Sequence, residues 1–295
     1  MIDLHSHILP GLDDGAEDLA TSLAMARAWV ADGVTVVACT PHITPGVYAN
    51  TGPQIRQAVA QLQLDLDEAG IPIKLVTGAD NHIMPDMVAG LAAGRLLTLA
   101  DTRYVLVEPT HHVAPLRLED LFFSLLVAGY VPILTHPERL SWIQGQYATI
   151  QRLVQAGVWM QVTAGSLTGA FGSSPRYWAE RMLDDGCVHI LATDAHNMKR
   201  RPPNLAEGQS IAAKRLGADE AERLVVARPR AILENLDPAD VSMPASCGHA
   251  GVSKNDGAWG HDGQVEHTRT GTGHGMAGGG IGARLSDRVR RLLGH

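Results

Sequence analysis

The chain alternates short apolar runs with amphipathic stretches, and this alternation constrains its fold more than any other feature of the sequence. Each run is short enough for one strand, whereas the stretches between runs repeat apolar residues at helical spacing. The runs lie at residues 2–7, 34–40, 73–77, 104–107, 131–135, 158–163 and 188–193. Strands that alternate with helices predict a parallel sheet, because parallel neighbours are joined by a crossover that is usually helical.

The order of these elements favours a barrel over an open sheet. No GxGxxG segment follows the first run, and nothing indicates the reversal of strand order that a doubly wound sheet requires. We therefore expect an α/β fold with a closed or nearly closed barrel of seven β/α units, (β/α)7, within the 295 residues. In such barrels the active site lies at the carboxyl ends of the strands.

Side chains that bind metals follow six of the seven runs, at the end where a barrel places its active site. They are His5, His7, His42, Asp80, Glu108, His136, Asp194 and His196. The pairs 5 and 7, and 194 and 196, are spaced i, i+2, which puts both members of each pair on one face of a strand. Any one of these residues alone could be a core histidine or a capping aspartate. Because six of the seven runs are followed by such a residue at the same end, the sequence predicts a polynuclear metal site.

The donor set indicates the class of metal and of reaction. Nitrogen and oxygen donors without cysteine suit Mn²⁺, Zn²⁺ or Fe²⁺ better than a metal that prefers thiolates. Eight groups exceed what one ion needs, so we expect two or three ions. Closely spaced divalent ions clamp the oxygens of a phosphate ester and generate hydroxide near neutral pH. Hydrolysis of a phosphate ester is therefore the first hypothesis.

Charge and hydropathy exclude several other classes of protein. The net charge of −7 and the isoelectric point near 6.0 argue against a nucleic-acid partner, which requires a basic face. No run approaches the ~18 apolar residues of a transmembrane helix, so we expect no integral membrane segment. The first residues carry acidic groups and no basic n-region, which does not match a signal peptide. We expect a cytoplasmic enzyme.

The composition changes near residue 240 and divides the chain into two parts. Residues 1–240 contain all the alternating elements and are expected to form the barrel. Residues 241–295 are rich in glycine and histidine, and thirteen of the 31 glycines fall between residues 239 and 295. A segment so poor in apolar residues cannot offset the entropy lost on ordering, so we expect a disordered tail.

Four segments taken together resemble a known superfamily. They are MIDLHSHILPGLDDGA at 1–16, DTRYVLVE at 101–108, THPER at 135–139 and TDAHNMKRRPPNLAEG at 193–208. The pattern is similar to that of the PHP superfamily, named for polymerase and histidinol phosphatase. Within it, the chain resembles the capsular-polysaccharide-type protein-tyrosine phosphatases of bacteria, from residue 1 to about 237.

The resemblance implies a distorted barrel of the PHP type and a Mn²⁺-dependent phosphatase, with Zn²⁺, Fe²⁺ or Mg²⁺ as alternative metals. The implied substrate is the phosphotyrosine tail of a bacterial tyrosine kinase, and the implied role is regulation of capsular or exopolysaccharide biosynthesis. The oligomeric state stays open.

The resemblance also implies which residues hold each ion. His5, His7 and Asp194 would hold the first ion, Asp80 would bridge it to a second held by Glu108 and His136, and Asp14, His42 and His196 would hold a third. Asp14 enters through the resemblance alone, and the neighbouring Asp13 is its competitor. The bridging position is normally glutamate in this family. Asp80 is one methylene shorter, so the bridge could lengthen or one ion bind more weakly. His82 is either a compensating donor or an exposed loop residue.

Two arginines match positions that hold the phosphate in this family. Arg139 lies three residues after His136, and Arg201 belongs to the KRRPPN loop, in which Lys199 and Arg200 are alternatives. A guanidinium presents paired donors to phosphate oxygens, whereas the competing interpretation for each arginine is a surface salt bridge. His111 and His112 stand on a loop that could touch substrate.

Several other functions remain as hypotheses. Histidinol-phosphate phosphatase, or another small phosphomonoesterase, would share the metal core. An amidohydrolase would usually carry a carbamylated lysine at a strand end, and no expected strand ends in lysine. A third alternative is a non-catalytic PHP domain that only binds the kinase. A cysteine-dependent phosphatase is excluded, because the sixth residue after each cysteine is Pro45, Thr193 or Ser253 and not the arginine of a Cys-x5-Arg loop.

The boundary near residue 240 can be tested by truncation. Deleting residues 244–295 should leave cooperative folding, metal content and turnover of a small aryl phosphate nearly unchanged, because the predicted ligand set ends at His196. Thermal unfolding, elemental analysis and steady-state kinetics of the truncated and full chains provide the comparison. A truncated chain that fails to fold or loses its metal would show that the boundary is wrong.

Overall fold

The computed structural model describes residues 1–244, so the expected tail lies almost wholly outside the described residues. The strands are β1 (Ile2–Asp3), β2 (Val36–Cys39), β3 (His42–Ile43), β4 (Lys74–Thr77), β5 (Asp80–His82), β6 (Tyr104–Glu108), β7 (Val131–Thr135), β8 (Trp159–Thr163) and β9 (Ile190–Ala192). The helices are α1 (Leu19–Ala31), α2 (Gly52–Glu68), α3 (Met87–Ala92), α4 (Leu118–Val127), α5 (Ile143–Ala156), α6 (Ala164–Thr168), α7 (Ser173–Asp184), α8 (Leu205–Leu216), α9 (Ala218–Glu222) and α10 (Arg228–Leu233).

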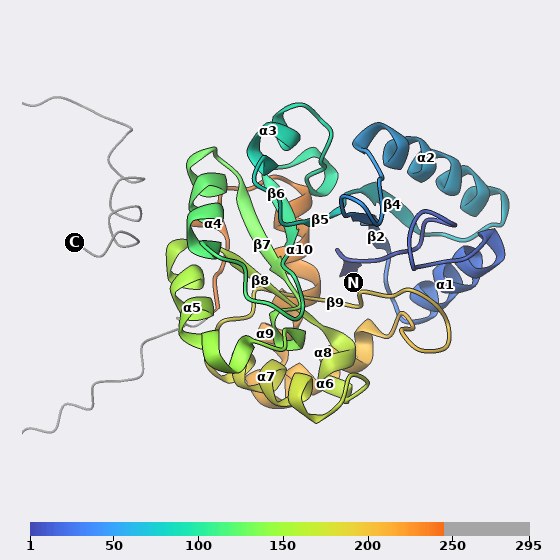
Figure 1. Ribbon diagram of the computed structural model, residues 1–295. Coiled ribbons are helices and arrows are strands. Elements are labelled where there is room, and N and C mark those ends of the chain that lie inside the picture. Colours follow the sequence, from blue (N-terminus) through green and yellow to red (C-terminus); the bar gives the residue numbers. More distant parts are fainter. Residues whose placement is uncertain (245–295) are drawn as a thin grey trace, which may run out of the picture. The chain divides into compact units, whose positions relative to one another are not determined.

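All seven expected runs contain a strand, and every ladder between these strands is parallel. Two further strands were not predicted. They arise because the chain bends after β2 and after β4 and then continues as β3 and β5. The strands therefore form two sheets, one of order β1-β2-β4 and one of order β3-β5-β6-β7-β8-β9. Figure 1 shows α1 and α2 beside the smaller sheet and α4, α5 and α7 around the larger one.

The two sheets close into a distorted barrel through the chain that follows β1 and β9. Asp194 donates its backbone N–H to the carbonyl of His5 at 2.9 Å, and His7 donates to the carbonyl of Ala195 at 2.9 Å. Ser6 and Ala195 form a parallel bridge between these segments. The expected barrel is confirmed, with its second and third strands each broken into two pieces.

Alternate residues of the strands face the barrel interior. The inner cluster consists of Ile2, Leu4, Ala38, Leu99, Tyr104, Leu106, Val131, Ile133, Trp159, Ile190 and Ile232, the last of them from α10. On β6, Tyr104 and Leu106 belong to this cluster, whereas Val105 and Val107 belong to the outer cluster that includes the helices. Glu108 continues the inner positions of β6, so the strand carries a carboxylate into the mouth of the barrel.

The buried His189 gives the fold a dependence on pH. Its ring stacks on that of Trp159, with centroids 5.1 Å apart, and its Nδ1 accepts a hydrogen bond from the Met160 N–H at 3.0 Å. Burial, followed by the positive charge of Arg228, lowers the pKa of His189 from 6.5 to about 3. Between these values the unfolded chain binds a proton that the folded chain does not. The free energy of unfolding therefore falls as the pH falls.

His189→Gln should weaken the loss of stability between pH 7 and pH 4, because the titrating group is removed and the glutamine carbonyl can still accept from Met160. Urea denaturation at several pH values in the presence of a chelator measures the dependence without metal release. The exposed His112 supplies the matched control, and His112→Gln should keep the wild-type dependence. If the free energy of unfolding depends on pH equally in the two variants, His189 is not the group responsible for this dependence.

Candidate metal centre

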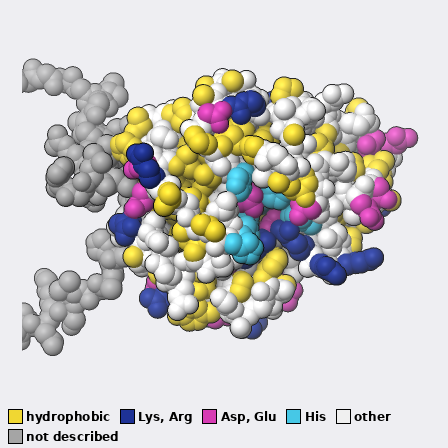
Figure 2. Space-filling model, viewed as in Figure 1, with side chains coloured by type: hydrophobic (Ala, Val, Ile, Leu, Met, Phe, Trp, Pro, Cys, Tyr) yellow, Lys and Arg dark blue, Asp and Glu magenta, His cyan; other side chains and the backbone are white. Residues whose placement is uncertain are grey.

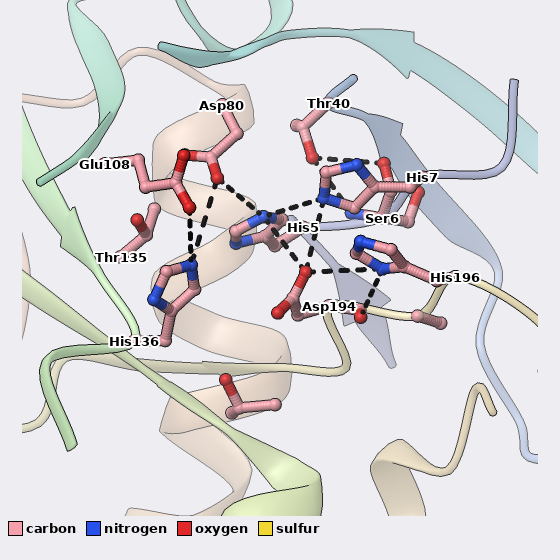
Figure 3. A network of polar contacts seen from close by, with 12 residues as sticks. His5, Ser6, His7, Thr40, Asp80, Glu108, Thr135, His136, Asp194 and His196 are labelled. Atoms are coloured by element: carbon pink, nitrogen blue, oxygen red, sulfur yellow. Dashed lines mark hydrogen bonds and ion pairs between the residues drawn. The ribbon is translucent and has the colours of Figure 1, made fainter. Parts of the chain in front are cut away.

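The predicted ligands meet at the carboxyl ends of the strands, although they come from segments as far apart as residues 5 and 196 (Figure 3). Within five groups the donor atoms all lie within 4.8 Å of one another. The groups are His7, Asp14, His42 and His196; His5, His7 and Asp80; His5, His136 and Asp194; Glu108, His111 and His136; and His42, Asp80 and Glu108. All nine residues of the predicted set take part in at least one group.

Two of these residues reach the cluster through an unusual backbone conformation. His136 has a φ of 35° and Asp194 a φ of 51°, which are left-handed values that residues other than glycine rarely adopt. Each residue directly follows a strand or its extension, and the left-handed turn redirects the chain there. Strain of this kind persists where the surroundings fix it, and it concentrates at functional sites.

The innermost donors are spaced as ligands of a shared ion would be. The Nε2 atoms of His5 and His7 lie 3.4 and 3.3 Å from Asp194 Oδ1, and His5 Nε2 lies 3.4 Å from Asp80 Oδ2. Two donors each about 2.1 Å from one ion, at a tetrahedral angle, would be about 3.4 Å apart. The donor atoms therefore fit a first-row divalent cation.

Buried oxygen and nitrogen atoms without hydrogen bonds support the same fit. Both carboxylate oxygens of Asp80, Oδ1 of Asp194 and Nε2 of His196 are buried and have no hydrogen-bond partner. Such atoms destabilise a fold unless something else satisfies them. Because these atoms belong to the donor cluster, cations bound there would satisfy them.

The outer nitrogens of the innermost histidines are held by neighbouring side chains. His5 Nδ1 lies 2.9 Å from Gln161 Oε1, and His7 Nδ1 lies 2.7 Å from Asp13 Oδ2. Asp13 also accepts from the N–H groups of His42 and Gly15, at 2.9 and 3.0 Å. Metal-binding histidines commonly make such contacts, which aim the other ring nitrogen at the ion. Asp13 therefore orients His7 and is not itself part of the donor cluster.

The sequence left open whether Asp13 or Asp14 belongs to the donor cluster. In the structure, Asp14 contributes a donor atom to it. Its Oδ1 lies 3.5 Å from His42 Nε2 and 3.4 Å from His196 Nε2. Its side chain is 46% exposed, so this corner of the cluster opens to solvent. A third ion here would be the most accessible of the set.

The carboxylates raise the proton affinity of two histidines. Burial alone would lower the pKa of His5, but the charges of Asp194 and Asp80 raise it to about 9. Burial likewise opposes protonation of His42, and a hydrogen bond with Glu108 together with the charge of Asp80 raises its pKa to about 10. In the metal-free protein, protons on these rings therefore offset part of the negative charge of the cluster.

The pKa values of two other histidines are lowered instead of raised. Burial lowers the pKa of His136 and of His196 to about 4, and the positive charges of Arg139 and of His7, respectively, add to the effect. These rings are neutral at pH 7 and offer a lone pair to a cation. Metal binding would displace the protons of the first pair, since a ligating imidazole must be neutral.

Both arginines predicted to hold phosphate reach the edge of the cluster. Arg139 and Arg201 each form an ion pair with Asp194 Oδ2. The guanidinium of Arg139 lies over the ring of Phe171, 4.4 Å from its centroid. The alternatives Lys199 and Arg200 are exposed and make no ion pair within the described residues.

Two histidines that the sequence left open, His82 as a compensating donor and His111 as a substrate contact, lie at the site. His82 Nδ1 and His111 Nε2 lie 3.7 and 3.5 Å from the carboxylate of Glu108, whereas His112 is exposed. Nothing in the sequence connects Gln161 or Phe171 with the site, because their contacts span long separations along the chain. The i, i+2 spacing of His82 from Asp80 on one strand was the available signal for His82.

The fold and this cluster define a class of protein, a distorted α/β barrel with a buried cluster of histidine and carboxylate groups that could hold metal ions. The chain belongs to the family described as "Capsular polysaccharide synthesis, CpsB/CapC", which matches residues 1–234. The resemblance seen in the sequence is therefore confirmed.

Curated relatives and a solved structure support the membership. The tyrosine-protein phosphatase YwqE of Bacillus subtilis (strain 168) is 39% identical over 220 residues, which cover 74% of this chain and 86% of YwqE. The tyrosine-protein phosphatase CpsB of Streptococcus pneumoniae is 27% identical over 238 residues, covering 79% of this chain and 98% of CpsB. A crystal structure from work on YwqE and CpsB, described as "unique metal-dependent tyrosine phosphatases", superposes with a TM-score of 0.77 at 36% identity. It covers 80% of this chain and 96% of that one.

One further finding bears on membrane association. Among the described residues, the helices are too short or too polar to cross a bilayer.

The ion content of the cluster is directly measurable. The purified protein should contain two to three transition-metal ions per chain, and chelation should lower its melting temperature, because a cation that binds only the native state stabilises it. His5→Ala should reduce the ion content and the melting temperature together. His112→Ala, which changes an exposed histidine outside the cluster, is the control and should alter neither. Full activity of a metal-free sample in chelator would refute the metal centre.

Proposed function

We propose that this protein hydrolyses phosphotyrosine in a protein substrate, as a metal-dependent phosphatase of capsular or exopolysaccharide synthesis. The observation that carries the proposal is the convergence of two guanidinium groups on a carboxylate of the donor cluster. Phosphate monoesters need both elements, cations to bind their oxygens and planar donors to orient them. The names and the identity of the relatives agree with this activity.

The proposed ligand sets follow the family resemblance, and distances between pairs of donor atoms in the cluster are compatible with them. His5, His7 and Asp194 would hold one ion, Asp80, Glu108 and His136 would hold a second, and Asp14, His42 and His196 would hold a third. We propose Mn²⁺ as the metal, with Zn²⁺, Fe²⁺ or Mg²⁺ as alternatives that the same donors accept. Bound divalent ions supply Lewis-acid stabilisation of phosphate oxygens and lower the pKa of water.

The arginines would bind and orient the phosphate. Their ion pairs with Asp194 hold both guanidinium groups at the edge of the cluster, and the ring of Phe171 restricts the motion of Arg139. A guanidinium contacts two phosphate oxygens in one plane, so two of them fix the direction of the ester bond. Both side chains are at least three-quarters buried, and limited access of water strengthens their contacts with an anion.

A cysteine nucleophile does not fit this protein. Cys39 is fully buried in β2, and burial raises the pKa of its thiol well above the ordinary value of 9.0. A thiol in that state is not a nucleophile, because the reactive form is the thiolate. The Cys39 thiol therefore does not serve as the nucleophile.

We propose the tyrosine-rich tail of a bacterial tyrosine kinase as the substrate and the cytoplasm as the place of reaction. Histidinol phosphate is the competing small substrate. The full donor set, with a carboxylate at position 80, favours an active enzyme over a domain that only binds the kinase. Mn²⁺-dependent phosphate release from a phosphotyrosine peptide and from histidinol phosphate decides between the substrates. Faster release from histidinol phosphate would overturn the assignment.

Substitution of Arg139 tests phosphate binding independently of metal binding. Arg139→Ala should lower kcat/KM for a phosphotyrosine peptide by roughly 10² to 10³, the effect of losing one preorganised donor. Arg139→Lys should restore only part, because an ammonium cannot reproduce the planar pair of donors. Metal content should stay constant in both variants.

Arg117 provides the matched control for this substitution. It pairs with Asp120 on the surface and its side chain is 84% exposed, so Arg117→Ala should leave the kinetics unchanged. Near-normal kinetics in Arg139→Ala would instead assign Arg139 to a structural ion pair with Asp194.

A further inference from the structure

A cavity of about 210 Å³ opens beside the donor cluster and has no role in the mechanism described so far. Its wall toward the cluster is formed by His42 and Glu108, and its outer walls include Tyr48, His82, Thr110 and His111. The two arginines meet the cluster elsewhere, at Asp194. Figure 2 shows histidine and acidic side chains in a central hollow of this face, with basic side chains beside them.

Tyr48 is held rigidly at the rim of this cavity. Its ring stacks on that of His42, with centroids 5.6 Å apart and planes 13° apart. Thr44 and Tyr48 exchange two backbone hydrogen bonds, at 3.0 and 2.9 Å, which close a tight turn. Gly46 has a φ of 80° within that turn, a value that favours glycine. The aromatic ring is therefore presented by a preorganised loop, and it is only partly buried.

We propose that this cavity receives the aromatic ring of the substrate's phosphotyrosine and that Tyr48 is the residue that selects aryl over alkyl phosphates. The inference rests on the proposed phosphatase activity and names a subsite for it. A cavity of about 150 Å³ is enough to hold benzene. The volume beside Tyr48 thus admits a tyrosine ring, whereas phosphoserine would leave it unfilled.

The two arginines and the cavity beside Tyr48 lie at different parts of the cluster. A phosphate bound between them would have the guanidinium groups on the side of Asp194 and its ester oxygen toward Glu108, beside the cavity. Tyr48 then offers an aromatic surface to the ring of the substrate. Aromatic pairs in offset or edge-to-face contact gain more than the burial of their area alone.

Phe171, the other aromatic side chain near the arginines, does not offer the same contact. The guanidinium of Arg139 covers its ring at 4.4 Å, and that of Arg201 lies 6.0 Å from its centroid. Its face is therefore engaged by the arginines. Among the described residues that line the cavity, Tyr48 carries the one six-membered aromatic ring, which stacks on His42 and is partly exposed.

Binding of two phosphonates, which cannot be hydrolysed, tests the subsite without turnover. Calorimetry on the Mn²⁺-loaded full chain should give a lower Kd for phenylphosphonate than for methylphosphonate, by about tenfold. Tyr48→Leu should reduce this preference to about twofold or less while leaving the Kd of methylphosphonate and the metal content unchanged. Tyr48→Phe should retain the preference, because it keeps the ring.

Tyr177 serves as the matched control, since it lies on the outside of α7 with 56% of its surface exposed. Tyr177→Leu should behave as the wild type. A Tyr48→Leu protein that keeps the preference for phenylphosphonate would overturn the subsite. Equal weakening of both phosphonates would also overturn it, because Tyr48 would then support the cluster and not the ring.

Steady-state kinetics test the aryl subsite and the proposed phosphatase activity independently of each other. With phosphotyrosine and phosphoserine peptides of one sequence, Tyr48→Leu should raise KM for the phosphotyrosine peptide and narrow the difference between the peptides. If the wild type fails to hydrolyse the phosphotyrosine peptide yet prefers phenylphosphonate through Tyr48, the phosphatase proposal falls and the aryl subsite stands. If it hydrolyses the peptide without that preference, the subsite falls and the phosphatase proposal stands.

Discussion

Asp194 makes the contacts that join the closure of the barrel to the donor cluster. Its backbone N–H bonds to the carbonyl of His5 and so ties the end of β9 to the end of β1. Its Oδ1 faces the rings of His5 and His7, and its Oδ2 receives both arginines. One residue in a left-handed conformation therefore connects the sheet, the proposed ions and the phosphate-binding groups.

Hydrogen bonds to the buried Asp3 hold the segment next to Asp194 in place. The buried carboxylate of Asp3 accepts hydrogen bonds from the N–H groups of Thr193 and His5 and from the Trp29 indole, at 3.1, 3.3 and 2.8 Å. These contacts join β1 to α1 and to the residue that follows β9. Burial raises the pKa of Asp3 in spite of them, so the charge is costly and its partners must stay in place.

The charge of the cluster then determines what it can bind. Four carboxylates, those of Asp14, Asp80, Glu108 and Asp194, contribute donor atoms to the cluster. Two divalent cations would match their charge, and the arginines add positive charge on one side only. This asymmetry would give the site a direction, because a phosphate would be drawn toward the arginines and its organic group would then lie on the side of Glu108.

The sequence predicted the strand runs and eight of the converging residues from strand periodicity, whereas Asp14 entered through the family resemblance alone. Glu108 illustrates this, since it continues the inward positions of Tyr104 and Leu106. The long-range partners were not predictable, because Gln161 contacts His5 across 156 residues. The broken strands were missed because a bend leaves no periodic signal, although Pro41 directly follows the second run.

Those bends also bear on the shorter side chain at position 80, where the family resemblance leads one to expect glutamate. Gly78 lies in the bend between β4 and β5, where a Cβ would come within 2.9 Å of Thr40 Cγ2. The absence of that atom lets the two bends pack closely, and Asp80 donates its N–H to the carbonyl of Pro41 at 3.2 Å. The backbone of β5 thereby starts inside the cluster, with Asp80 Oδ2 at 3.4 Å from His5 and 3.9 Å from His136. Asp80 therefore faces donors of both proposed inner ions in spite of its shorter side chain.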